Sequence, residues 1–251
     1  MKLFIEVVEI SENKDNDSHH AQPQHEIPKH IAIIPDGNRR WATQKGITKQ
    51  DGYRIGIEHI GDVVKWCKEA NVTMLTMWGF STDNFKRDDD EIHGLFELFK
   101  KNLLEGLQTK EKEGRKIKVR FLGRTNLFPK DIRALFDKIE EKTKGHGPYQ
   151  LNLLLSYGGR EEIVDAINNI ISEGIEKVDE KIISDHVYTK GLPDPDLIIR
   201  TSGEKRLSGL MPWQTCYSEY YFCDKLWPDF SKEDFMAAID DFTRRKRRYG
   251  K

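Results

Sequence analysis

The chain has 251 residues, and its 41 lysines and arginines nearly balance its 42 aspartates and glutamates, which gives a formal net charge of −1. Balanced charge supplies no overall field that would attract nucleic acid, and no apolar run approaches the roughly 18 residues of a membrane span. The three cysteines form neither a Cys-x-x-Cys pair nor a zinc-binding spacing. These features argue against a nucleic-acid-binding protein, a membrane span, a disulfide scaffold and a zinc finger. We expect a cytoplasmic enzyme with a substantial core.

Residues 1–26 are expected to form a flexible extension. The stretch 11–26 contains no aromatic residue and no aliphatic residue larger than Ala21, so it cannot bury enough apolar surface to offset the entropy of ordering. Its three histidines could bind a metal ion, but a solvated tail is the simpler interpretation. One folded domain is expected over residues 27–251.

Short apolar runs and helical patterns alternate along the folded part. The runs that are typical of buried strands are 30–34, 73–80, 116–123, 150–159 and 196–203. Between them, apolar residues recur at helical spacing, for example over 55–67 and 95–107. Continuous rather than alternating apolar strands indicate a parallel sheet that is covered on both faces. We therefore predict a single α/β domain with a central, mostly parallel sheet of about six strands flanked by helices.

Polar residues follow the ends of four of these strands, which is where ligands bind in open α/β sheets. The segments are 35–41, 81–87, 157–160 and 200–208. Arginine recurs in each of them, and its planar guanidinium group suits phosphate oxygens. Gly37 and Asn38 can turn tightly and direct backbone N–H groups at an anion. Together with the carboxylate of Asp36, these groups predict an Mg²⁺-assisted diphosphate site, because Mg²⁺ needs only one or two carboxylates besides phosphate oxygens.

Each of these features also has a structural explanation. Asp36 could cap a helix, Arg200 could belong to a structural ion pair, and the basic run 244–248 could be a solvated helix end. The acidic run 88–91 is interpreted as a solvated loop and the first turn of a helix. The sequence contains neither a P-loop nor a dinucleotide-binding motif.

Five motifs resemble those of the cis-prenyltransferase family, which includes undecaprenyl diphosphate synthase. They are HIAIIPDGNRRWA from His30, GFSTDNFKR from Gly79, LLSYGGREEI from Leu154, DLIIRTSGEKRLSGLMPWQ from Asp196 and YSEYYFCDKLWPDF from Tyr217. They occur in the family's order and spacing and cover nearly the whole folded part. An isoleucine rather than a methionine before Pro35-Asp36 resembles the archaeal members.

The resemblance implies a cis-prenyltransferase fold and a Mg²⁺-dependent Z-(cis-)prenyltransferase. Such an enzyme ionises an allylic prenyl diphosphate, joins it to isopentenyl diphosphate and releases a proton to leave a new Z double bond. The product is a medium- or long-chain polyprenyl diphosphate, the precursor of a glycosyl-carrier lipid. A homodimer and peripheral membrane contact through the product are implied as well.

Roles for single residues also follow from the resemblance. Asp36 would bind Mg²⁺ in a site completed by Glu219, and Asn84, beside Ser81, would orient or help deprotonate isopentenyl diphosphate. The other expected substrate contacts are Gly37, Asn38, Arg39, Arg40, Trp41, Lys49, Tyr53, Thr82, Asp83, Phe85, Arg87, Arg200, Arg206, Leu207 and Ser208. Arg248, in a C-terminal Arg-x-Gly, would reach the neighbouring subunit's site.

Three positions depart from the family's usual pattern. Lys49 and Tyr53 stand where bacterial members usually have an arginine and a histidine, and Asp83 stands where a glutamate is usual. Because a lysine is a point charge rather than a fork, allylic diphosphate binding could be rearranged, with Arg54 compensating.

Two alternative functions remain open from the sequence. One is a non-head-to-tail condensation by the same site. The other is a non-catalytic partner subunit, which is disfavoured because Asp36 and the arginines that such a subunit would lose are all present. Product length is not determined, although Gly79 should leave a tail tunnel open at its mouth and Leu153 could contribute to its floor.

Overall fold

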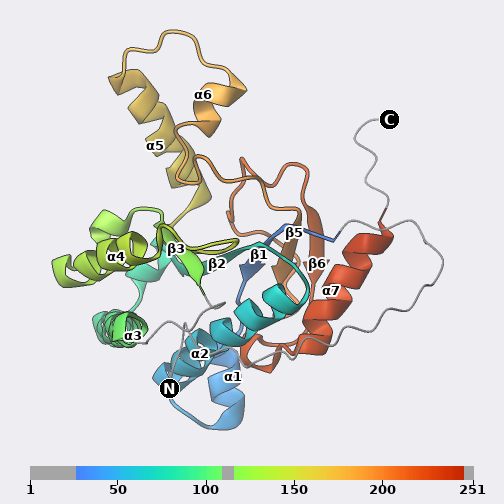
Figure 1. Ribbon diagram of the computed structural model, residues 1–251. Coiled ribbons are helices and arrows are strands. Elements are labelled where there is room, and N and C mark those ends of the chain that lie inside the picture. The colour runs from blue at the N-terminus through green and yellow to red at the C-terminus, as the bar shows by residue number, and fades with distance from the viewer. Residues whose placement is uncertain (1–26, 109–115, 246–251) are drawn as a thin grey trace.

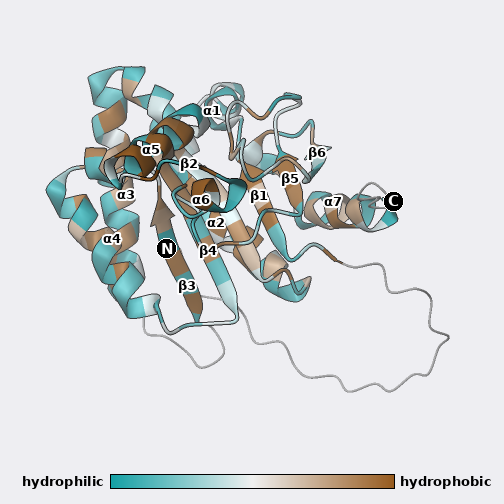
Figure 2. Cartoon of the chain, turned by 90° about the horizontal axis from the view of Figure 1, so that it is seen from above, coloured by the Kyte–Doolittle hydropathy of each residue, from teal (hydrophilic) through white to brown (hydrophobic). Residues whose placement is uncertain are grey.

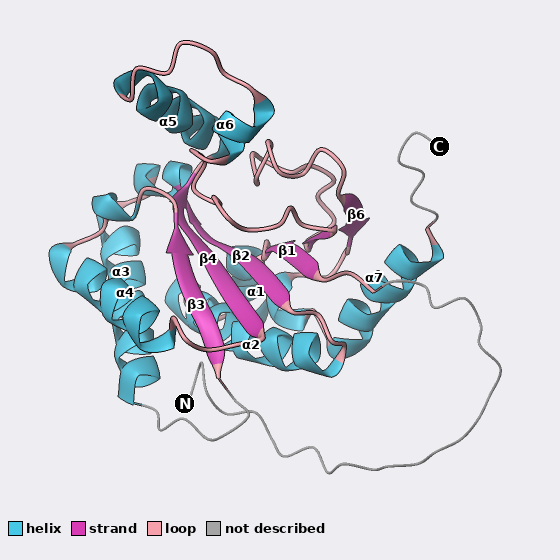
Figure 3. Cartoon of the chain, turned by 45° about the horizontal axis from the view of Figure 1, so that its top comes forward, coloured by secondary structure: helices cyan, strands magenta, loops and turns pink. Residues whose placement is uncertain are grey.

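The computed structural model describes residues 27–108 and 116–245, so the extension expected over residues 1–26 lies outside the described residues. Its strands are β1 (His30–Ile34), β2 (Met74–Ser81), β3 (Ile117–Leu122), β4 (Tyr149–Tyr157), β5 (Leu197–Arg200) and β6 (Glu219–Phe222). They form one sheet in the order β3-β4-β2-β1-β5-β6, and every neighbouring pair is parallel, as Figure 3 shows. The predicted α/β fold is confirmed, with a sheet that is entirely parallel.

The predicted strands agree with the first five observed strands to within a few residues. The sixth strand, β6, was not predicted as a strand. Its four residues are all only partly buried, because β6 lies at the edge of the sheet beside β5. An edge strand of this kind lacks the continuous apolar run that marks a strand buried on both faces.

Seven helices of the described residues surround the sheet. They are α1 (Asn38–Lys45), α2 (Lys49–Glu69), α3 (Asp89–Gln108), α4 (Lys130–Thr143), α5 (Gly159–Ser172), α6 (Glu180–Ser184) and α7 (Lys232–Arg244). The larger apolar cluster joins α2, α3, α4 and α7 to one face, while Leu210 and Met211 cover Tyr157 on the other. Figure 2 shows hydrophobic strands inside and hydrophilic outer faces on helices such as α4. No helix in the described part of the chain is long and apolar enough to cross a membrane.

The strand order places a topological switch at the centre of the sheet. From β1 the chain builds β2, β3 and β4 on one side, and it then crosses to β5 and β6 on the other (Figure 1). Ligands bind at the carboxyl ends of strands where the order reverses. The segments that follow β1, β2 and β5 therefore meet at this point.

A close contact between helices fixes the loop after β1. Gly56 of α2 has no side chain, and a Cβ there would lie 2.0 Å from Oδ1 of Asn38. The Gly56 carbonyl also accepts a hydrogen bond from Nε1 of Trp227 at 2.8 Å. Because Gly56 leaves this space, α1 and α2 pack tightly beneath the strand ends.

A buried histidine joins β1 to its neighbours. The side chain of Asn152 donates to Oγ1 of Thr76 at 3.0 Å, and Thr76 lies 2.7 Å from Nε2 of His30. Nδ1 of His30 lies 2.8 Å from the carbonyl of Pro193, which can only accept, so the chain of bonds fits a neutral imidazole. Burial lowers the pKa of His30 to about 4, although the bond to Pro193 acts in the opposite direction.

This burial predicts a loss of stability in acid. The unfolded state binds a proton near pH 6.5, whereas the folded state resists protonation until about pH 4. The contribution of His30 is therefore complete above pH 6.5, and up to about 3 kcal/mol is lost as the pH falls to 4. Denaturant unfolding measured from pH 7 to 4 should show that the free energy of unfolding falls less steeply with decreasing pH for His30→Gln than for the unchanged protein. An equal slope in both would contradict the assignment, and His93→Gln, at an exposed position, is the control.

Candidate active site

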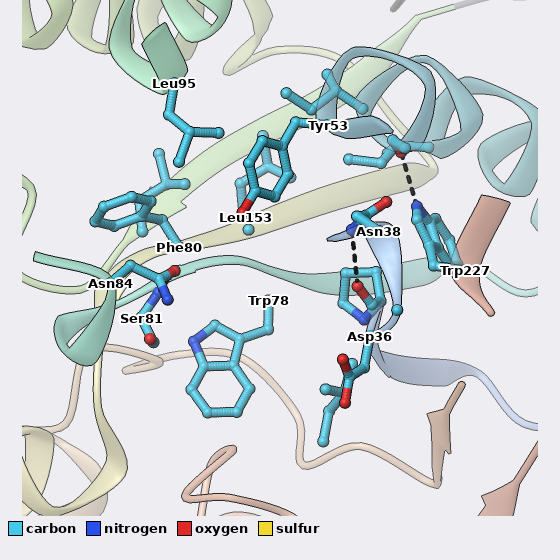
Figure 4. A pocket seen from close by; sticks show the side chains of 18 of the residues that line it. Asp36, Asn38, Tyr53, Trp78, Phe80, Ser81, Asn84, Leu95, Leu153 and Trp227 are labelled. Atoms are coloured by element: carbon cyan, nitrogen blue, oxygen red, sulfur yellow. Dashed lines mark hydrogen bonds between the residues drawn. The ribbon is translucent and has the colours of Figure 1, made fainter. Parts of the chain in front are cut away.

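One cavity of about 540 Å³ opens at the carboxyl ends of β1, β2 and β5 (Figure 4). The predicted site residues that line it are Asp36, Gly37, Asn38, Arg39, Arg40, Tyr53, Ser81, Asn84, Arg87, Arg200, Arg206 and Ser208. Its apolar lining comes from the large cluster between the sheet and α2, α3 and α4, and includes Ile60, Leu95, Phe99, Leu103, Phe121, Phe136 and Leu153. A charged mouth and an apolar interior therefore belong to the same cavity.

The turn after β1 is held by backbone contacts. The Asp36 carbonyl accepts from Oγ1 of Thr201 at 2.7 Å and from the backbone N–H of Trp227 at 3.0 Å. Gly37 has a φ of 115°, and a Cβ there would lie 2.9 Å from the side chain of Leu226, so only glycine fits. Gly37 is also the N-cap of α1, with no side-chain capping bond. The capping role considered for Asp36 is therefore not observed.

Asp36 is held between two arginines. Nη2 of Arg200 donates to Oδ2 of Asp36 at 2.9 Å, and Nη2 of Arg40 lies 3.4 Å from Oδ1. Burial acts to raise the pKa of the Asp36 carboxyl, but the bond from Arg200 and the two positive charges outweigh it and lower the pKa below its ordinary value. The carboxylate is therefore ionised at neutral pH and able to bind a cation.

Arg200 connects this carboxylate to the segment after β5. Its side chain is only 4% exposed, and Nη1 donates to Oγ of Ser208 at 2.8 Å and to the carbonyl of Arg206. The ion pair with Asp36 that was considered as a structural explanation does exist. One buried guanidinium thus fixes both the proposed metal ligand and the loop that carries Arg206.

The predicted partner of Asp36 in a metal site is not nearby within one chain. Glu219 begins β6 and pairs in register with Leu197, whereas Arg200, whose side chain contacts Asp36, pairs with Phe222 at the other end. The Glu219 carboxylate binds Nη1 of Arg245 at 2.7 Å. Because parallel strands align their ends, Glu219 faces the amino edge, and the expected Asp36–Glu219 pair is not formed in the chain.

The donors at this site fit a magnesium ion that arrives with its substrate. The described residues contain no cluster of three or more His, Cys, Asp or Glu side chains that could hold a metal. Mg²⁺ is usually bound by one or two carboxylates together with phosphates and water. An ionised Asp36 beside several arginines satisfies that requirement, while a cage made only of protein ligands does not exist here.

Asn84 is oriented by the backbone at the end of β2. The backbone N–H of Ser81 donates to Oδ1 of Asn84 at 3.0 Å, so the amide oxygen is engaged and the NH₂ group is the part left for the cavity. Figure 4 shows Ser81 and Asn84 side by side at its edge. An NH₂ group donates hydrogen bonds and cannot take up a proton. This geometry favours an orienting role for Asn84 over deprotonation.

Two of the three residues that depart from the family pattern form one cluster with Glu91. Tyr53 donates to Oε1 of Glu91 at 2.7 Å, Lys49 lies 3.3 Å from Oε2, and Nη1 of Arg87 donates to the Tyr53 hydroxyl at 2.9 Å. The Glu91 side chain is only 9% exposed. The interpretation of run 88–91 as solvated is therefore wrong for its last member, while residues 88–90 are exposed.

The compensation expected from Arg54 is not observed. Its guanidinium binds Glu58 at 3.1 Å and lies 3.7 Å from Asp51, and it does not line the cavity. Both partners belong to α2, as Arg54 itself does. Arg54 therefore belongs to an ion-pair network along its own helix.

Several expected substrate contacts point elsewhere in the described structure. Trp41 donates to Asp229 at 2.8 Å, Thr82 binds Glu161 and Asp83 binds Lys86. Phe85 packs on Phe80 with ring centroids 5.0 Å apart, and Leu207 packs against the smaller cluster. Lys49 does not line the cavity and binds Glu91 instead, and Arg248 lies outside the described residues. A motif predicts that these residues are near the site but not which way their side chains point.

Glu204, Trp78 and Asn102 are among the lining residues that were not predicted from the sequence. Glu204 lies 3.8 Å from Arg40 and also binds Arg206. Trp78 projects beneath β2 in Figure 4, and its Nε1 is buried without a partner among the described residues. Asn102 of α3 is buried among apolar residues. A polar residue inside the apolar helical pattern 95–107 was the signal that could have drawn attention to Asn102.

Comparisons with known proteins identify the family of this chain. The family model described as putative undecaprenyl diphosphate synthase matches residues 34–250. A tritrans,polycis-undecaprenyl-diphosphate synthase (geranylgeranyl-diphosphate specific) from Methanocaldococcus jannaschii is 39% identical over 100% of this chain and 89% of its own length. An isoprenyl transferase from Thermus thermophilus is 41% identical over 90% of this chain and 89% of its own.

Two solved structures share the fold. Lavandulyl diphosphate synthase from Lavandula x intermedia, in complex with dimethylallyl diphosphate, gives a TM-score of 0.84 at 30% identity over 90% of this chain and 99% of that chain. A probable undecaprenyl diphosphate synthase from Campylobacter jejuni gives 0.74 at 32% identity with the same coverage.

An all-parallel α/β sheet whose arginine-rich cavity continues into an apolar interior suits a transferase whose substrates join an anionic head to an apolar tail. The chain belongs to the undecaprenyl diphosphate synthase family of cis-prenyltransferases, and it is a prenyltransferase. The resemblance inferred from the motifs is thus confirmed, with archaeal and bacterial relatives at similar identity.

The double role of Arg200 predicts the effect of a conservative change. Arg200→Lys keeps the charge but cannot bridge Asp36 and Ser208 at once, so it loses at least one charge-assisted hydrogen bond. We expect kcat/KM to fall about 10- to 100-fold, measured by steady-state kinetics. Arg124→Lys disturbs a comparable bidentate pair with Asp165, at 2.7 and 2.8 Å, outside the cavity and should leave kcat/KM unchanged. Unaltered kinetics in Arg200→Lys would refute this role.

Proposed function

We propose that this prenyltransferase is a Mg²⁺-dependent Z-(cis-)prenyltransferase that condenses isopentenyl diphosphate with an allylic prenyl diphosphate. Its product would be a medium- or long-chain polyprenyl diphosphate. The observation that carries the proposal is the single cavity that joins an arginine-lined mouth to an apolar interior. Arginines suit the diphosphates of both substrates, and the interior suits a growing hydrocarbon chain.

The positive charges at the mouth are placed to stabilise the negative charge that develops in the reaction. When the allylic C–O bond breaks, negative charge accumulates on the departing diphosphate. Arg39, Arg40 and Arg87 line the cavity and would stabilise that charge from fixed positions, which is effective because the donors need no reorganisation during the reaction. Arg200, Arg206 and Ser208 would hold isopentenyl diphosphate, and the Asn84 amide would orient it.

Asp36 would hold the Mg²⁺ ion. Its pKa is lowered by Arg200 and Arg40 despite its burial, so the carboxylate carries its charge throughout the neutral range. A bound Mg²⁺ would act as a Lewis acid on the diphosphate oxygens. The arginines would then share the remaining negative charge of the substrate.

The starter, the assembly and the location are parts of the same proposal. The M. jannaschii relative is named as specific for geranylgeranyl diphosphate, so we propose that compound as the allylic substrate. The lavandulyl diphosphate synthase structure contains dimethylallyl diphosphate, which makes this shorter compound the second starter to compare. We further propose a cytoplasmic homodimer in which Arg248 reaches the partner's cavity and the apolar product draws the enzyme to the membrane surface.

A product assay tests this function. The protein is incubated with Mg²⁺, radiolabelled isopentenyl diphosphate and each allylic starter, and butanol-extracted products are resolved by chain length and linkage. We expect a linear Z-polyprenyl series that disappears with EDTA and returns with added Mg²⁺. Asp36→Asn should reduce turnover at least about 100-fold, whereas Asp131→Asn, an exposed carboxylate paired with Lys100, should not. The absence of product with every starter, or a product joined in non-head-to-tail fashion, would overturn the proposal.

Asn102 predicts a change in product length. Its side chain is buried, lines the cavity and donates to the carbonyl of Leu98 at 2.8 Å. An apolar chain that reaches this amide would cover its polar atoms without offering them hydrogen bonds, and that contact is unfavourable. Asn102→Ala removes the amide and adds space, so the product distribution should move to longer chains by at least one isoprene unit. Leu104→Ala, on the same helix but partly exposed and outside the cavity, should give the original distribution; identical distributions for both variants would contradict this role.

A further inference from the structure

The first turn of α3 carries a carboxylate that gathers cations from two other segments. Glu91 is 9% exposed, and its oxygens contact the Tyr53 hydroxyl at 2.7 Å, Lys49 at 3.3 Å and Arg87 at 3.3 Å. Lys49 and Tyr53 belong to α2, while Arg87 follows β2. Glu91 therefore connects the α2 wall of the cavity to the segment after β2.

The Tyr53 hydroxyl completes this arrangement. It donates to Glu91 and accepts from Nη1 of Arg87 at 2.9 Å, so its single proton has a fixed direction. The Arg87 guanidinium also lies over the Tyr53 ring, 5.7 Å from its centroid, a favourable cation–π arrangement. Figure 4 shows Tyr53 reaching over the cavity from α2. Tyr53 is thereby held as a neutral support for Arg87.

The contacts leave one edge of Arg87 for a ligand. Among the described residues, only Nη1 of Arg87 has a protein partner, so Nε and Nη2 remain for the cavity that Arg87 lines. These two N–H groups lie side by side on one edge of the planar guanidinium, and they can donate to two oxygens of a phosphate group. Glu91 itself does not line the cavity, so it acts on a ligand only through its neighbours.

Charge explains why a carboxylate is needed at this position. Lys49 and Arg87 approach the same point, and without a negative charge between them they would repel each other. The Glu91 carboxylate offsets one positive charge and leaves the cluster with a net charge of one positive. A glutamine would preserve the shape but neither the attraction nor the fixed position of Arg87.

From these contacts we infer that Glu91 is a positioning residue for the allylic diphosphate, acting from outside the cavity through Arg87 and Tyr53. The inference rests on the proposed function, since it assigns the far edge of Arg87 to the substrate's diphosphate. It gives Tyr53 and Lys49 a common role in place of the arginine and histidine that are usual in bacterial members. It also gives the last residue of the acidic run 88–91 a function in substrate binding.

A matched pair of variants tests the inference. Arg54 and Glu58 form another i,i+4 arginine–glutamate pair, at 3.1 Å on α2 and away from the cavity. Glu91→Gln should raise KM for the allylic diphosphate about tenfold and leave KM for isopentenyl diphosphate unchanged, whereas Glu58→Gln should change neither. A purely structural role would lower the active fraction, and hence kcat, without raising one KM. Equal KM values in Glu91→Gln and the unchanged protein would overturn the inference.

Direct binding separates this inference from the proposed function. Inorganic pyrophosphate, titrated into the protein by calorimetry, should bind about tenfold more weakly to Glu91→Gln than to Glu58→Gln. Tyr53→Phe provides a second test if Glu91→Gln unfolds, because it removes only the hydroxyl that supports Arg87 and should weaken pyrophosphate several-fold. If the unchanged protein forms no prenyl product, the proposed function fails; if it forms product and pyrophosphate binds equally to all variants, only the role of Glu91 fails.

Discussion

The contact on which the rest of the site depends is the buried ion pair of Arg200 and Asp36. A guanidinium that is 4% exposed would cost several kcal/mol if left unpaired. It is paired with Asp36 at the end of β1 and donates to Ser208 in the segment after β5. The same pair that offsets the burial of charge therefore holds the turn after β1 against the segment after β5. Both the proposed metal ligand and the loop with Arg206 take their positions from it.

The parallel sheet determines why polar and apolar groups meet in one cavity. Because β1 lies between β2 and β5, the polar segments after these strands converge at one edge. Behind that edge, the sheet packs on α2, α3 and α4 through apolar side chains. A space left between those layers is apolar inside and charged at its mouth, and a prenyl diphosphate has the same distribution. The charged head and apolar tail of such a substrate thus match the charged edge of the sheet and the apolar space between the sheet and the helices.

The sequence predicted the features that depend on local pattern and on strand direction. Continuous apolar runs revealed the buried strands, and the shared edge of parallel strands brought together Asp36, Ser81 and Arg200 as expected. It did not reveal β6, whose partly buried residues carry no such run. It did not show that Glu219 lies at the amino end of β6, away from Asp36 of the same chain. The sequence also could not show that the Glu91 side chain is shielded from solvent, because its exposure depends on how closely α2 and α3 pack.

Acidic residues at the mouth and beside it have a common physical role. Asp36 separates Arg40 from Arg200, Glu91 separates Lys49 from Arg87, and Glu204 lies between Arg40 and Arg206. Each carboxylate permits cations to be close together before a substrate is present, because it offsets their repulsion. Yet arginines outnumber carboxylates among the cavity-lining residues, so the mouth keeps an excess of positive charge for diphosphates. A chain whose overall charge is almost zero can therefore hold a strongly cationic site, because the balance is made locally, residue by residue, around the arginines.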